Sequence, residues 1–120
     1  MRIIDAHVHV GCDRRTKYYT EKELWKDLRE AGAQGAVIFA FPEDIYRIKD
    51  SEESRLEANE YVLELSRKSP DLYPFYFVWN DFLIPENIDE YVGVKWHRHY
   101  DEPRYDYDDL KCKRFLKVIK

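Results

Sequence analysis

The chain has 120 residues, 44% hydrophobic, 16% aromatic and 37% charged, a composition that suits one domain over residues 1–120 and excludes a disordered protein. Its length is well short of the roughly 250 residues of a complete TIM barrel. The 20 basic and 24 acidic residues give a formal net charge of −4, so we expect no nucleic-acid partner.

The N-terminal half predicts two strands joined by a helix. Residues 2–10 read as a strand, and residues 20–31 as a helix with a capping box between Thr20 and Glu23 and a stop at Gly32. Residues 35–41 are apolar on both faces, which is typical of a buried parallel strand.

The C-terminal half predicts a helix, two strands and a last helix. Ser54 and Glu57 suggest a second capping box, and Pro70 lies past the end of that helix. Residues 72–79 and 91–97 read as strands, and Pro74 fits only near a strand start or at an edge. Asp108 or Asp109 would cap the last helix, on which Cys112 is expected in the core. The order β-α-β-α-β-β-α predicts an α/β fold with a parallel sheet and right-handed crossovers.

Several classes of protein are not expected from this sequence. No stretch approaches the ~18 apolar residues of a membrane span, and Asp5 interrupts the region where a signal peptide would be apolar. Cys12 and Cys112 lack the spacing of a zinc site or a disulfide framework. We therefore expect a cytoplasmic protein with no membrane partner.

Strand 2–10 carries the strongest chemical signal. A period of two places Asp5, His7 and His9 on one face and apolar residues on the other. Two imidazoles at i and i+2 near the carboxyl end of a parallel strand can bind one cation, and active sites gather at that end. His7 and His9 are therefore the predicted metal ligands; the alternative is a pair of histidines satisfied by hydrogen bonds.

Strand 91–97 repeats this pattern with Lys95 and His97, and with His99 if the strand extends. Lys95 could hold an anionic substrate or carry a metal-bridging carbamate, and His97 could orient a substrate or act as an acid or base. The alternatives are an ion pair between Lys95 and Asp5, and a loop position for His99.

Two segments together resemble the metal-dependent amidohydrolase superfamily. Residues 1–11, MRIIDAHVHVG, look like its opening strand with the Asp-x-His-x-His signature, and residues 93–100, GVKWHRHY, are similar to the fourth strand of the amidohydrolase 2 branch. That branch includes relatives of aminocarboxymuconate semialdehyde decarboxylase. Residues 54–78 also resemble its second helix and third strand.

The resemblance implies the first half of a TIM barrel, about four strands with their helices, and a metal-dependent hydrolase or decarboxylase acting on a small carboxylate or carbonyl compound. One divalent ion, Zn or else Mn, would be bound by His7 and His9, and His97 would lie at the substrate face. The further metal ligands and the catalytic aspartate of the family come from strands five to eight, so activity as a monomer is not expected. Asp5 and His97 are the candidate general bases.

Three interpretations remain open from the sequence. Two copies could complete a barrel as a homodimer, or a chain with the C-terminal half-barrel could complement this one. In the third, the chain is a non-catalytic fragment or interaction module that binds a small anion. The anion would be bound by Lys95, Arg98 and Arg14 or Arg15; the alternative for the arginines is an ordinary solvated loop. The loops after strands 2–10 and 91–97 also carry tyrosines that could line a pocket mouth or a subunit contact, or simply pack in the loops: Tyr18, Tyr19, Tyr100, Tyr105 and Tyr107.

Overall fold

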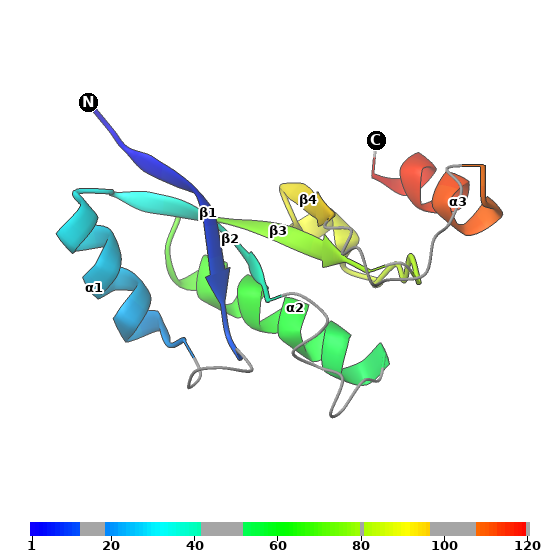
Figure 1. Cartoon of the computed structure of the whole chain (residues 1–120), viewed down its shortest axis with the longest axis horizontal. Helices are drawn as coiled ribbons and strands as arrows, with labels where there is room; N and C mark the ends of the chain where they lie inside the picture. The colour runs from blue at the N-terminus through cyan, green and yellow to red at the C-terminus, as the bar shows by residue number, and fades with distance from the viewer. Residues whose placement is uncertain (13–18, 42–51, 80, 97–107, 120) are drawn as a thin grey trace.

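The computed structural model describes residues 1–12, 19–41, 52–79, 81–96 and 108–119. These residues form a sheet with helices beside it (Figure 1). In chain order the elements are β1 (Ile4–Val10), α1 (Glu21–Ala31), β2 (Gly35–Ala40), α2 (Glu52–Lys68), β3 (Leu72–Val78), the 3-10 turn η2 (Ile88–Glu90), β4 (Gly93–Trp96) and α3 (Leu110–Val118).

The sheet has four strands in the order β1-β2-β3-β4, and every pairing is parallel. The predicted α/β class, the parallel sheet and the βα units are therefore confirmed. The sheet is not closed into a barrel.

Local sequence signals account for the ends of α1. Thr20 and Glu23 form the predicted capping box, in which the Glu23 N–H donates to Thr20 Oγ1 at 3.3 Å and the Thr20 N–H to Glu23 Oε2 at 2.7 Å. Gly32 ends the helix at φ 73°, a left-handed conformation that glycine adopts without steric cost.

The sequence predicts the ends of the later helices less exactly. Helix α2 begins at Glu52, two residues before Ser54, so the predicted Ser54–Glu57 capping box is wrong. It ends at Lys68, before Pro70, as expected. Asp109 rather than Asp108 caps α3, accepting the Lys111 N–H at 2.7 Å, and Cys112 is buried in the core as predicted.

The strand register divides the sheet into two faces. Ala36, Ile38 and Ala40 alternate along β2, are fully buried, and share a cluster with Leu24 of α1 and Val62 of α2. Helix α3 contributes to a second cluster over β3 and β4. That cluster contains Cys112, Phe115, Tyr76, Val78, Val94 and Trp96. Because Ile38 pairs with Pro74, Tyr76 and Val78 lie on the same face as Ile38. The described helices thus cover one face, which we call the helix face.

The strands are staggered. Strand β3 pairs with β2 through residues 72–74 and with β4 through residues 75–78. Pro74 lies near the start of β3, one of the two positions that the sequence allows, and β3 is an inner strand. The N–H and C=O of a strand residue point to the same side, which for Pro74 is the β4 side. The Pro74 carbonyl accepts the Val92 N–H at 2.9 Å. The N–H that proline lacks would lie before the start of β4, so no hydrogen bond between the strands is lost.

Candidate functional site

The two strand-one histidines lie side by side on the face opposite the helices. The His7 and His9 rings are 5.2 Å apart between centroids. Both contact the ring of Phe39 in β2, at 4.9 and 4.5 Å between centroids and nearly perpendicular to it. His7 is exposed and His9 is half-buried.

Asp5 does not share this face. The register between β1 and β2 shifts between Asp5 and Val8, so Asp5 pairs with Ala36 while His9 pairs with Phe39. Ala36 and Phe39 are three residues apart and thus on opposite faces of β2. This bulge breaks the predicted alternation, because one extra residue in β1 reverses the sides of the residues before it. The Asp5 carboxylate accepts the His7 backbone N–H at 2.9 Å.

The backbone of β2 orients the His9 ring. His9 Nδ1 lies 2.7 Å from the carbonyl oxygen of Ala40. A carbonyl only accepts hydrogen bonds, so Nδ1 carries the proton and the lone pair of the neutral ring is on Nε2. Metal-binding histidines commonly show this arrangement, in which a carbonyl holds one nitrogen and the other faces the ion.

Lys95 of β4 joins the same group. Its Nζ lies 5.2 Å from the centre of the Phe39 ring, a cation–π contact. The predicted alternative of a Lys95–Asp5 ion pair is not found among the described residues. Phe39 thus brings together side chains from β1 and β4, which are not neighbouring strands. We call His7, His9, Lys95 and Phe39 the basic cluster.

The basic cluster supplies two of the ligands that a metal site needs. A catalytic zinc site usually has three protein ligands and a water, and no group of three His, Cys, Asp or Glu side chains occurs within the described ranges. His97, predicted as substrate-binding or catalytic, lies outside the described residues. So do His99, the three arginines and four of the five tyrosines of the anion-binding interpretation.

Tyr19, the one described member of those tyrosines, packs against α1. Its hydroxyl donates to Asp27 Oδ2 at 2.6 Å. Burial and this hydrogen bond to a carboxylate raise the pKa of the Tyr19 phenol. Tyr19 is therefore held against α1 by this hydrogen bond.

Asn59 of α2 is a buried polar residue that helical periodicity does not single out. Its Oδ1 accepts the Phe77 N–H at 2.8 Å, and its Nδ2 donates to the Phe77 carbonyl at 3.0 Å. The described β2–β3 pairing stops at Ile38 and Pro74, so Asn59 satisfies backbone groups that face β2 where the two strands separate. A lone amide on an otherwise apolar helix face was the available signal.

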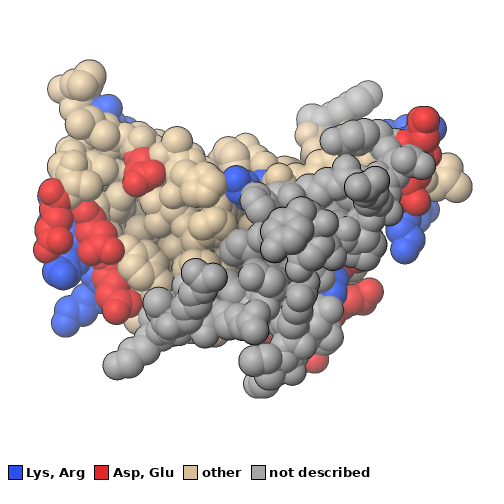
Figure 2. All heavy atoms as spheres, viewed as in Figure 1, with Lys and Arg blue, Asp and Glu red and all other residues tan. Residues whose placement is uncertain are grey.

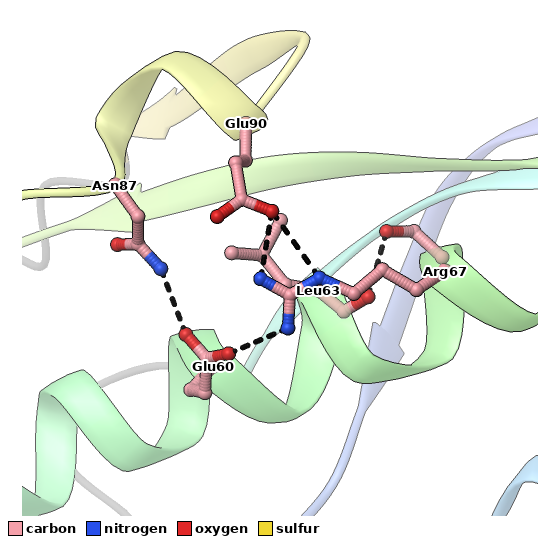
Figure 3. Close-up of polar contacts among 6 residues, drawn as sticks. Glu60, Leu63, Arg67, Asn87 and Glu90 are labelled. Atoms are coloured by element: carbon pink, nitrogen blue, oxygen red, sulfur yellow. Dashed lines mark hydrogen bonds and ion pairs between the residues drawn. The ribbon is translucent and has the colours of Figure 1, made fainter.

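An ion-pair network ties α2 to the segment before β4 (Figure 3). Arg67 contacts Glu60 at 2.8 Å and Glu90 at 2.7 Å, and Asn87 donates to Glu60 at 2.9 Å. The hydrogen bonds to Glu90 and Glu60 raise the pKa of Arg67. The network fixes the entry to β4 and hence the start of the strand that carries Lys95.

Two clefts lie away from the basic cluster. One of about 370 Å³ lies beside η2, β4 and the end of α3, and one of about 470 Å³ lies between α2 and the residues around Asn87. Neither is lined by His7, His9 or Lys95, and the chemistry of the basic cluster does not extend to them.

No family model matches the sequence, and the searches of curated proteins and of solved structures give no match. The resemblance to amidohydrolases therefore stays a prediction. Among the described residues, no helix has the length and apolar character to span a membrane.

Proposed function

We propose that the basic cluster is the metal- and substrate-binding site of a metal-dependent hydrolase or decarboxylase that acts on a small carboxylate or carbonyl compound. The observation that carries this proposal is the His9 Nδ1 contact with the Ala40 carbonyl, beside His7 on the helix-free face. This contact leaves the lone pair of His9 on Nε2, which points away from the backbone. A divalent ion there could accept this lone pair together with one from the His7 ring.

The residues divide into roles that follow from their chemistry. His7 and His9 would hold the ion, Zn or else Mn, which lowers the pKa of a bound water and polarises a substrate oxygen. Lys95 would hold the carboxylate of the substrate. His97 is the better candidate general base, because the β1 register directs Asp5 to the other face.

Zinc titration of the full chain tests the metal site. Isothermal titration should give a saturable site, and His9→Ala should weaken it at least tenfold, since removal of one of two protein ligands leaves a single imidazole. Cys12→Ser is the matched control, because Cys12 is an exposed thiol just after β1 and an adventitious zinc ligand. Equal affinity in wild type and His9→Ala would contradict the proposal.

A second candidate function is binding of a small anion without catalysis. Three basic side chains surround Phe39, and together they could bind a carboxylate or phosphate with no metal. Titration of acetate or inorganic phosphate in the presence of a chelator separates the two functions. Binding that survives the chelator and is lost in Lys95→Met favours the anion-binding module.

A further inference from the structure

The surface that a neighbouring βα unit would cover is exposed and apolar. The exposed large hydrophobic side chains include Ile3, just before β1, and Val92, just before β4. On α3, Leu110, Leu116 and Val118 are exposed as well. These residues lie at the two outer strands and on the helix that follows β4. Each outer edge of the sheet therefore presents apolar side chains that a partner could cover.

The two outer strands also expose backbone groups that are not paired with another strand. Among the described residues, no strand pairs with the outer edge of β1 or β4; only Gly11, after β1, forms a bridge with Tyr19. Natural proteins pair or cover such edges. The sequential strand order, the helices on one face and the stagger of β3 are features of a sheet that curves towards a barrel.

The charges of the two edges are complementary. Helix α3 carries Lys111, Lys113, Arg114 and Lys117 and no acidic residue after its cap Asp109. Lys113 pairs with Asp108 at 3.1 Å, which leaves Lys111, Arg114 and Lys117 as the other basic side chains of the helix. Asp5 on β1 is exposed and lies on the helix face by register. At the α1 end of the molecule acidic and basic side chains lie together (Figure 2), so the complementarity comes from Asp5 and α3. In a (βα) barrel, the helix after one strand packs beside the next strand. A second β1 placed next to β4 would therefore bring its Asp5 beneath this basic helix.

We propose that a second copy of this chain covers these surfaces, with β4 of each copy paired to β1 of the other around a two-fold axis. Two four-stranded sheets make the eight strands of a closed parallel barrel. Val92 then meets the Ile3 of the partner subunit, and the helix-free faces line one interior. The His7–His9 pairs of both copies open into that interior, which provides four imidazoles; this last step rests on the proposed metal site.

Sedimentation velocity of the full chain tests the dimer. We expect the mass of two chains at micromolar concentration, with and without chelator. Val92→Lys and Ile3→Lys should each raise the dimer dissociation constant at least tenfold, because each buries a charge at the new strand pair. Leu56→Lys is the matched control, since Leu56 is 36% exposed on α2 and away from both edges.

Charge variants provide a second, independent measurement. Asp5→Lys places like charge beneath the basic α3 of the partner and should weaken the dimer. Glu53→Lys makes the same change of charge at the start of α2 and should leave the dimer intact. Circular dichroism shows that each variant is folded. A single-chain mass for the wild type at all concentrations, or equal dimerisation of Asp5→Lys and Glu53→Lys, overturns the proposal.

The outcomes separate this inference from the proposed function. A dimer that binds no zinc supports the shared barrel and contradicts the metal site. A single chain that binds zinc through His9 supports the metal site and overturns the shared barrel. A zinc stoichiometry of one per dimer that is lost in His9→Ala supports both.

Discussion

Asn59 shows how a single side chain can replace a strand. Its amide group bonds both backbone groups of Phe77 and is 1% exposed. An amide has one acceptor and one donor side, as a peptide group has, so it fits where β2 no longer pairs with β3.

Asn59→Ala should lower the free energy of unfolding by about 3 kcal/mol, since it leaves two buried backbone groups without a hydrogen bond. Urea denaturation measures the change. Asn87→Ala is the control; Asn87 is half-buried and makes one side-chain bond to Glu60, and its loss should cost less than about 1 kcal/mol. Equal losses for the two variants would show that Asn59 does not support β3.

Tyr76 gives a prediction for alkaline pH. Burial raises the pKa of its phenol, whose hydroxyl donates to the Leu83 carbonyl at 2.7 Å. The unfolded chain loses this proton near pH 10 and the folded chain retains it, so unfolding releases a proton above pH 10. The free energy of unfolding should fall as pH rises, by up to about 1.4 kcal/mol per pH unit for this residue.

Tyr76→Phe tests that assignment in urea denaturation between pH 8 and pH 11. The variant should be less stable at pH 8, because it loses the bond to Leu83, and its stability should fall less steeply above pH 10. Parallel pH curves for wild type and variant would mean that Tyr76 titrates alike in both states.

At the scale of elements, the sequence predicted α1 well because both ends of this helix are set by local chemistry. The capping box fixes the start of α1 and Gly32 fixes its end, and each acts on residues within one helical turn. The start of α2 and the bulge in β1 could not be predicted in this way. The bulge depends on how β1 pairs with β2, and no residue of β1 alone shows it.

Thr20→Ala should destabilise the protein by about 1 kcal/mol, because the cap bond to the Glu23 N–H is lost. The measurement is again the urea midpoint at constant slope. Lys22→Ala, in the same turn but exposed and outside the cap, should change the midpoint by less than half as much. A larger effect of Lys22→Ala would contradict the role of the capping box.

At the scale of the molecule, the order of the elements could be predicted, and the faces of the site only partly. The alternation along residues 2–10 predicts one face for His7 and His9, the same pattern in residues 91–97 singles out Lys95, and all three contact Phe39. The sequence predicts Phe39 only as part of a buried strand. Its role was not predictable, because its partners come from strands far apart in sequence and in the sheet.

Hydrogen exchange should distinguish the strands by the exchange rates of their backbone amides. Amides of β2 between Ala36 and Ile38 lie between two paired strands and should exchange slowest, while alternate amides of β1 and β4 face outward. If two copies pair, protection of the outward amides should increase with protein concentration. Protection of β1 that is equal to that of β2 in dilute protein would contradict the open sheet.

The stagger of β3 has a mechanical consequence. Three residue pairs, Ala36–Leu72, Val37–Tyr73 and Ile38–Pro74, join β1 and β2 to β3 and β4, and beyond them Asn59 spans the gap. Phe77 pairs with Lys95 of β4, and Asn59 of α2 bonds both backbone groups of Phe77. The position of Lys95 relative to His9 therefore depends on how one helix packs against the sheet as well as on strand pairing.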